Sequence, residues 1–122
     1  HCISSAASDV YKRQALAALK MQFGMPRPLQ NQNGARFLRN GTITIYHTEL
    51  APGNQAEITF NVQPISSSYG IAPAKLNALL DECRNLTGRP TEVNKLQNWP
   101  RIGLATEEDV TLVMDKLAVL KK

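Results

Sequence analysis

Arg101 is the residue of this 122-residue chain whose chemistry stands out first. It precedes Ile102, Gly103 and Leu104, a run that predicts a short, mostly apolar strand. A guanidinium group on a buried strand is costly unless a carboxylate pairs with it, and that carboxylate can belong to the protein or to a ligand. We therefore expect Arg101 either to form a structural ion pair or to bind a substrate carboxylate.

A second candidate group is basic and includes one aromatic side chain. Arg27, Arg36 and Arg39 surround an irregular segment that also contains Phe37. Arginines interleaved with an aromatic ring can bind phosphates and stack on bases. No ribonucleoprotein, KH or zinc signature accompanies them, so a solvated loop is the alternative, and nucleic acid is not the partner that we expect first.

The other chemically able side chains have ordinary structural explanations. One histidine and one cysteine on separate elements cannot make a metal site, which needs three or four ligands. Carboxylates in the first turn of a capped helix are explained by the helix dipole, and a serine-rich stretch without a Gly-x-x-x-x-Gly-Lys pattern is a weak phosphate site. We predict no catalytic residue, no metal site and no cofactor bound by this chain alone, after weighing His47, Cys83, Glu107, Glu108, Asp109 and Ser66–Gly70.

Composition and charge limit the class of protein. The formal net charge of +4 and the sequence pI near 9.3 amount to a mild basic excess. No apolar run reaches the roughly 18 residues of a membrane-spanning helix, so we expect no membrane partner. Cys83 is the only cysteine after residue 14, which rules out a disulfide within that part and favours a reducing, cytoplasmic location.

Periodicity predicts the elements that position these side chains. Alternating residues predict strands at 41–50 and 57–63, joined as an antiparallel β-hairpin (about 42–63) with Ile58, Phe60 and Val62 inward. Helices are predicted at 15–23, 73–86 and 106–120, the last capped by Thr106, whereas 25–40 reads as loop or edge segment and 64–72 as loop. The stripes expected to face the core are Leu76, Leu79, Leu80, Cys83 and Leu86, then Val110, Val113, Met114, Leu117 and Leu120. We expect an α+β fold with a small, mostly antiparallel sheet, helices on one face and solvent on the other.

Residues 4–14 resemble a translated sequencing-library adapter. The transposase adapter, read in frame, encodes Ser4 to Gln14 in this order. The resemblance implies that residues 1–14 are an artefact and not part of the native protein. The length of the remaining part, residues 15–122, is enough for one domain, and we expect it to form one. A chain that begins in an adapter begins where a nucleic acid was cut. We therefore expect 15–122 to be the C-terminal part of a larger protein or, as the alternative, a small complete protein starting at Met21 or Met25.

A family resemblance covers residues 56–120. The succession Ala56–Val62, Ala74–Leu86, Arg101–Leu104 and Thr106–Val110 is similar to the C-terminal small domain of fold-type I pyridoxal-phosphate enzymes, in the aminotransferase class V and cysteine-desulfurase-like branch. The resemblance implies that Arg101 clamps the substrate carboxylate. It also implies that the cofactor, pyridoxal phosphate, belongs to the parent protein, whose large domain is missing here.

Two hypotheses about function follow, and Arg101 separates them. In the first, the chain is the substrate-closing domain of a pyridoxal-phosphate aminotransferase or lyase, inactive alone, with its missing upstream domain and a second copy of itself as partners. In the second, it is a non-enzymatic α+β interaction module that binds protein or RNA. The enzyme hypothesis requires Arg101 to be free at an open edge, and the module hypothesis requires it to be paired within the fold.

Overall fold

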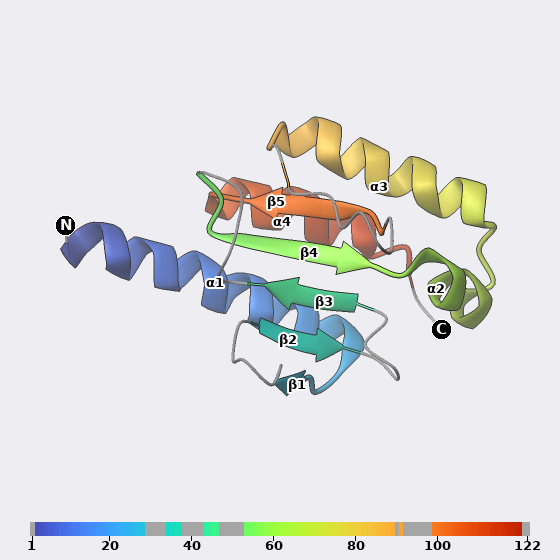
Figure 1. Cartoon of the computed structure of the whole chain (residues 1–122), viewed down its shortest axis with the longest axis horizontal. Coiled ribbons are helices and arrows are strands. Elements are labelled where there is room, and N and C mark those ends of the chain that lie inside the picture. The colour runs from blue at the N-terminus through green and yellow to red at the C-terminus, as the bar shows by residue number, and fades with distance from the viewer. Residues whose placement is uncertain are drawn as a thin grey trace.

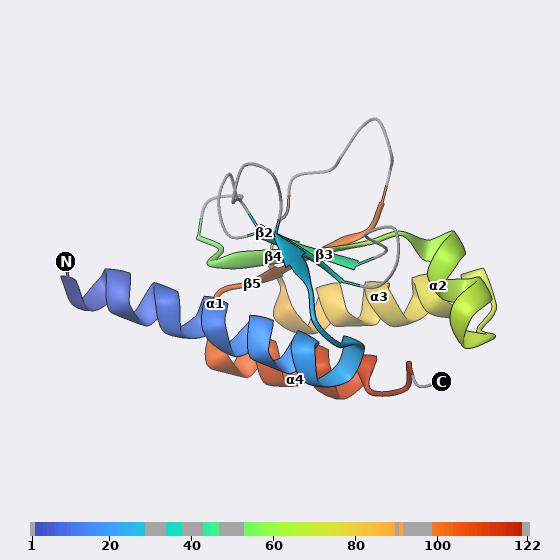
Figure 2. The ribbon, with the colours of Figure 1, turned by 90° about the horizontal axis from the view of Figure 1, so that it is seen from below.

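The sheet at the centre of the molecule has one helical layer, which lies against one of its faces (Figures 1 and 2). The computed structural model describes residues 2–28, 34–37, 43–46, 53–89, 91 and 99–120, and for residues 2–12 it describes the backbone alone. The described elements, in chain order, are α1 (Cys2–Phe23), β1 (Arg27–Pro28), β2 (Gly34–Phe37), β3 (Ile43–Tyr46), β4 (Ala56–Phe60), α2 (Val62–Tyr69), α3 (Pro73–Thr87), β5 (Arg101–Leu104) and α4 (Glu107–Leu117). The predicted α+β fold is confirmed.

The strands form one antiparallel sheet in the order β1-β2-β3-β4-β5. Each strand therefore pairs with its neighbour in sequence, and β1 and β5 lie at the two edges. The predicted β-hairpin is confirmed, because β3 pairs with β4 and Ile45 lies opposite Ile58. Both helices α2 and α3 come between β4 and β5, so only the last pairing joins segments that are distant in the chain.

The register gives the sheet one apolar and one polar face. Directly opposed residues of an antiparallel pair share a face, so the pairings can be followed across all strands. The apolar face packs against the helices and is buried, and its residues are Ala35, Phe37, Ile43, Ile45, Ala56, Ile58, Phe60, Ile102 and Leu104. Residues of α1, α3 and α4 complete this core from below the sheet, as Figure 2 shows.

Local signals explain the two best-marked helices. Thr106 caps α4 in a capping box with Asp109, as each side chain bonds the other's backbone N–H. Pro73 occupies the first turn of α3, where a missing N–H is tolerated, and Gly88 ends the helix with a φ of 64°, a left-handed conformation that suits glycine. Both predicted helices are confirmed, although Leu86 is 45% exposed and lies outside the core stripe expected for it.

Helix α1 runs without interruption from Cys2 to Phe23 and packs beside α4 (Figures 1 and 2). Ala15 and Leu19 are fully buried in the core. Gln22 donates hydrogen bonds to the carbonyl oxygens of Leu117, the last residue of α4, and of Leu120, which follows the helix. The part of α1 that follows residue 14 is therefore a structural element of the domain. None of the described helices has the length and apolar content to cross a membrane.

Two local predictions are wrong, and a third is right only in part. The stretch 25–40, predicted as loop or edge segment, contains the edge strand β1 but also β2, which is paired on both sides. Gly34, which resembles a chain breaker, is a strand residue at a close approach, since a Cβ there would lie 1.9 Å from the carbonyl oxygen of Ile45. The predicted strand extension to Gln63 and the loop at 64–72 give way to α2, so Val62 begins a helix instead of facing inward from a strand. The polar face is not wholly solvated, because Thr44, Glu57 and Thr59 are buried on it.

Candidate functional site

One row of polar side chains crosses the sheet on the face opposite the helices. Arg27 pairs with Arg36, Arg36 with Thr44, Thr44 with Thr59, and Thr59 with Arg101. These five residues, one from each strand, form what we call the polar row. It begins and ends with arginine, and it contains three of the predicted site residues, Arg27, Arg36 and Arg101.

At the β5 end of the polar row, Arg101 is held by contacts within the fold. Its Nη1 lies 3.0 Å from Oε1 of Glu57, and its Nε donates to Oγ1 of Thr59 at 3.1 Å. The guanidinium group also lies over the ring of Tyr46, with 4.8 Å between Cζ and the ring centroid. The Arg101 side chain is 14% exposed and that of Glu57 is fully buried. The structural ion pair, one of the two arrangements expected from the sequence, is the one observed.

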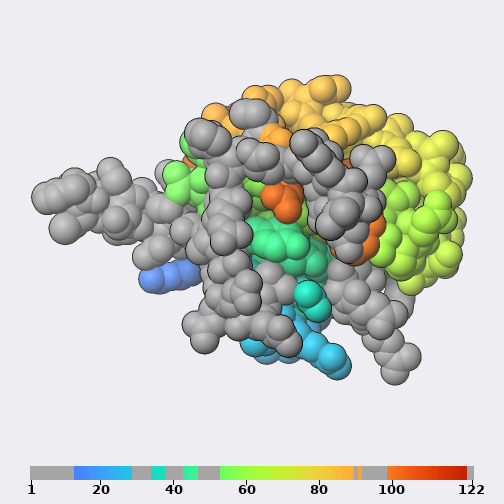
Figure 3. Space-filling model, in the orientation of Figure 1, coloured from blue at the N-terminus to red at the C-terminus, as the bar shows by residue number. Residues whose placement is uncertain are grey.

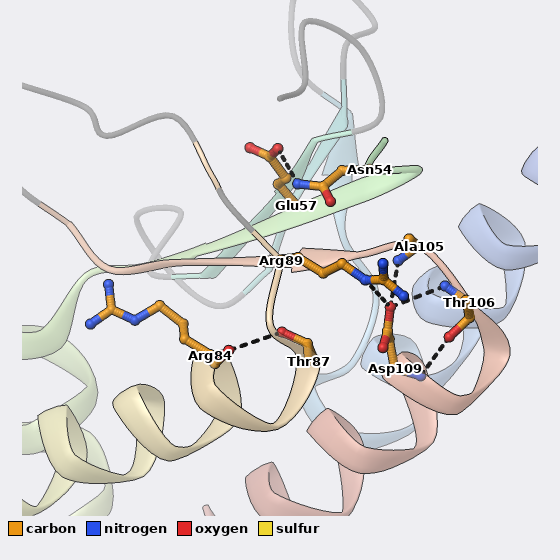
Figure 4. A network of polar contacts seen from close by, with 8 residues as sticks. All are labelled: Asn54, Glu57, Arg84, Thr87, Arg89, Ala105, Thr106 and Asp109. Carbon is orange, nitrogen blue, oxygen red and sulfur yellow. Dashed lines mark hydrogen bonds and ion pairs between the residues drawn. The ribbon is translucent and has the colours of Figure 1, made fainter. Parts of the chain in front are cut away.

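Glu57 has a second contact that fixes its carboxylate. Nδ2 of Asn54 donates to its Oε2 at 2.8 Å (Figure 4). Because Oε1 contacts Arg101, both carboxylate oxygens are bonded. Asn54 also lies against Gly103, where a Cβ would come within 2.5 Å of Nδ2. The glycine opposite Glu57 in the sheet thus leaves the space in which the asparagine amide reaches the carboxylate.

At the β1 end of the polar row, the charges have different surroundings. Arg27 and Arg36 are exposed, and their Cα atoms are directly opposed between β1 and β2. Among the described residues no ion pair includes either of them, whereas Arg84, Arg89, Arg101 and Lys116 each pair with a carboxylate. Two like charges are therefore neighbours on an edge of the sheet.

Phe37, the predicted aromatic partner of these arginines, does not lie on their face of the sheet. Phe37 is adjacent to Arg36 in sequence, so it points to the opposite face of β2, and it is fully buried in the core. Base stacking on Phe37 is excluded by this burial, and that part of the prediction is wrong. Arg39 and His47 lie outside the described residues.

Cys83 is the buried, inert side chain that the sequence suggested, whereas Ser66 lies in helix α2 rather than in the predicted loop. Cys83 is fully buried, and burial raises the pKa of its thiol to about 11, so it is a neutral thiol at physiological pH. Ser66 is buried in α2 and donates from its hydroxyl to the carbonyl oxygen of Ile71. Neither side chain is placed to act on a substrate.

The three carboxylates at the start of α4 divide into two kinds. Glu107 and Glu108 are exposed, as expected of partners of the helix dipole. Asp109 is buried, and its Oδ2 accepts from the backbone N–H groups of Ala105 and Thr106 and from Nε of Arg89 at 2.9 Å (Figure 4). Sequence reasoning missed Arg89, which follows the end of α3 and ties it to the start of α4.

The described residues hold no group of three or more His, Cys, Asp and Glu side chains that could bind a metal ion. Comparison with protein-family models, with curated proteins and with solved structures finds no significant match to this chain. The polar row thus combines a largely buried, paired arginine at its β5 end with two exposed arginines at its β1 end.

Proposed function

We propose that this chain is a non-enzymatic α+β interaction module that binds an acidic partner through Arg27 and Arg36. The observation that carries the proposal is the contrast within the polar row. Arg101 already has a carboxylate in Glu57, whereas the exposed arginines of β1 and β2 have none among the described residues. The pairing of Arg101 within the fold is also the arrangement that the module hypothesis requires.

The electrostatics of the exposed pair favour an anionic partner. Like charges directly opposed on neighbouring strands lower the stability of a sheet. A carboxylate or phosphate placed between Arg27 and Arg36 would remove this repulsion and accept charge-assisted hydrogen bonds from both guanidinium groups. Binding would thus relieve an unfavourable interaction in the free protein as well as add contacts.

The edge strand itself favours recognition by side chains. Pro28 lies in β1, which has two residues, and Pro26 precedes it. Proline has no backbone N–H, and a short edge strand with proline is a poor template for an added strand. We infer that the partner contacts the arginine side chains rather than extending the sheet.

Nuclear magnetic resonance titration tests this proposal. The backbone amide signals of the whole chain would be followed while either poly-glutamate or oligouridine is added. We expect salt-sensitive shifts centred on β1 and β2, which the double variant Arg27→Glu/Arg36→Glu removes and the control Lys75→Glu, at an exposed position on α3, does not. If neither polyanion shifts β1 and β2, the proposal is wrong.

The extent of the module has to include α1. Ala15 and Leu19 lie in the core, so a chain starting at Met21 or Met25 would lack two buried apolar side chains. Truncating a single buried leucine costs about 2–5 kcal/mol, which is a large part of the stability of a small domain. We therefore propose that the module includes Ala15 and Leu19 instead of starting at Met21 or Met25, as the sequence had suggested.

The second candidate function is the small domain of a pyridoxal-phosphate enzyme in a larger cytoplasmic protein. The succession β4, α3, β5 and capped α4 supports it, although α2 is an added helix between β4 and α3. In that case Arg101 would have to exchange Glu57 for a substrate carboxylate when the missing large domain is present. Amplification of the 5′ end of the parent transcript tests this candidate, which requires an upstream open frame encoding a large domain with a Schiff-base lysine.

A further inference from the structure

Arg27 and Arg36 stand in a geometry that the sheet fixes, and we call them the exposed arginine pair. Because their Cα atoms are directly opposed between β1 and β2, both side chains leave the sheet on the same face, with Cβ atoms about 5 Å apart. Pro26 and Pro28 lie on either side of Arg27 and restrict its backbone. Two guanidinium groups that start this close can reach one anion together.

The described carboxylates leave the charge of the exposed arginine pair in place. Residues 15–48, which include both arginines, contain no Asp or Glu. Glu57 is on the same face but two strands from β2, a separation of about 10 Å, and it pairs with Arg101. Figure 3 looks onto this face, since the helices lie behind the sheet, and it shows the cyan atoms of β2 above the light-blue atoms of the stretch that ends with β1. Two positive charges are thus presented together at this edge of the face.

A phosphate monoester matches two neighbouring guanidinium groups better than a carboxylate does. At neutral pH it carries a charge of about −1.5 to −2 and has three terminal oxygens that accept hydrogen bonds. One such group can therefore accept from both arginines and neutralise both charges. A carboxylate has one charge and two oxygens, and a single guanidinium group already satisfies it by a bidentate pair. One carboxylate would leave a net positive charge on the exposed arginine pair.

The described strands favour a phosphorylated protein segment over a nucleic acid or a membrane. Their aromatic side chains offer no open ring to a base, because Phe37 and Phe60 are buried on the apolar face and the guanidinium group of Arg101 lies over the ring of Tyr46. Attraction to anionic lipids takes clusters of about four to eight Lys or Arg, whereas the exposed arginine pair has two. A phosphate on a protein side chain requires neither stacking nor a long row of cations.

We propose that the exposed arginine pair binds the phosphate monoester of a phosphorylated side chain in a protein segment. This inference rests on the proposed function, since it names the anion that the same two arginines recognise. Because Pro28 makes β1 a poor template for an added strand, the segment contributes its phosphate rather than its backbone. Binding then depends on the phosphorylation state of the partner, since the unmodified segment lacks the dianion.

Nuclear magnetic resonance titration of the whole chain tests the inference with short peptides of glycine and alanine that differ in one central residue. That residue is phosphoserine, O-sulfoserine, glutamate or serine, and O-sulfoserine has the tetrahedral shape of the phosphate with a single charge. We expect the phosphoserine peptide to bind β1 and β2 about tenfold more tightly than the O-sulfoserine and glutamate peptides, because only the dianion neutralises both arginines. The serine peptide is expected not to bind. Oligouridine with a 5′-phosphate, the same anion on a nucleic acid, is expected to bind no more tightly than the phosphoserine peptide.

Single variants show whether one phosphate contacts both arginines. In Arg27→Gln and in Arg36→Gln we expect the phosphoserine peptide to lose its advantage, so that it binds within about twofold of the glutamate peptide. The control Lys75→Gln removes an exposed cation from α3 and is expected to keep the tenfold preference. Circular dichroism of each variant verifies that it is folded.

The outcomes separate this inference from the proposed function. Equal binding of the phosphoserine, O-sulfoserine and glutamate peptides would overturn the inference and leave an acidic partner in place. An undiminished preference in either single variant, tighter binding of the 5′-phosphorylated oligouridine, or binding of poly-glutamate without binding of any of these peptides would do the same. If poly-glutamate, oligouridine and all the peptides fail to shift β1 and β2, both proposals are wrong.

Discussion

Arg101 and Arg36 lie on the same face of one sheet and in the same polar row, yet their surroundings differ. Arg101 is 14% exposed and is held by Glu57, Thr59 and the Tyr46 ring. Arg36 is exposed beside Arg27. The difference shows that the role of an arginine on a sheet depends on whether its neighbours include a carboxylate. Where they do, the charge is paired within the fold, and where they do not, the charge stays exposed.

The largest expected loss in the free energy of unfolding follows the change Glu57→Gln. It leaves the Arg101 cation largely buried without its anion, and removing one partner of a buried pair costs about 3 kcal/mol or more. Urea unfolding followed by circular dichroism measures the loss. The double variant Glu57→Met/Arg101→Met should recover most of it, because apolar replacement of a buried pair is often neutral. Equal losses in the single and double variants would show that the pair is not the cause.

The carboxylates at the start of α4 show the same contrast between a buried and an exposed charge. Asp109→Ala removes the acceptor for Arg89 and for two backbone N–H groups, and we expect it to lower the free energy of unfolding by about 2 kcal/mol. Glu108→Ala, at an exposed site next to it, should change that free energy by less than about 0.5 kcal/mol. Urea unfolding of both variants measures the two losses in the free energy of unfolding, and losses of similar size would contradict this prediction.

A smaller effect is expected for Arg101→Lys, which keeps the charge but not the shape of the side chain. The ammonium group can still reach Glu57, but the hydrogen bond from Nε to Thr59 and the planar contact with Tyr46 are lost. We expect a loss of about 1 kcal/mol in the free energy of unfolding. Arg36→Lys at the exposed end is the matched control and should leave thermal unfolding unchanged.

The smallest effect has the opposite sign. Arg36→Glu turns the like-charged pair with Arg27 into an attractive one, and we expect a gain of about 0.5 kcal/mol at low salt. The gain should disappear in high salt, since the pair is exposed. Arg27→Glu/Arg36→Glu restores repulsion and should return the stability to that of the parent chain. A stabilisation that persists in high salt would point to a cause other than charge.

The sequence predicts the elements that carry their own signals. Thr106, which three carboxylates follow in sequence, predicts the start of α4, and alternating β-branched residues predict β3 and β4. For 25–40 it predicts only a loop or an edge segment and does not locate β1 and β2, because both are short and lie in an Asn- and Gln-rich stretch with Pro28 and Gly34, which resemble loop residues. Helix α2 is missed because Ile58, Phe60 and Val62 continue the alternation of a strand. Pro64, in the first turn of that helix, was the available signal.

The arginines of the candidate site are predictable from the sequence, but their partners are not. That Arg101 needs a carboxylate follows from its neighbours in sequence. That the carboxylate is Glu57, 44 residues earlier, depends on the register of β4 against β5, which no local pattern contains. The orientation of Phe37 was missed for the same reason, since a residue in an unrecognised strand cannot be assigned to a face.

The order of the strands has a consequence for how the molecule folds. Strands β1 to β4 succeed one another through short connections, whereas β5 returns to the sheet only after residues 61–100. The pairing of β4 with β5 closes the longest loop and therefore costs the most conformational entropy. We infer that β5 joins the sheet after the folding transition state. Interactions made by β5 would then act mainly on the rate of unfolding. The Arg101–Glu57 pair would accordingly determine how long the native state persists more than how quickly it is reached.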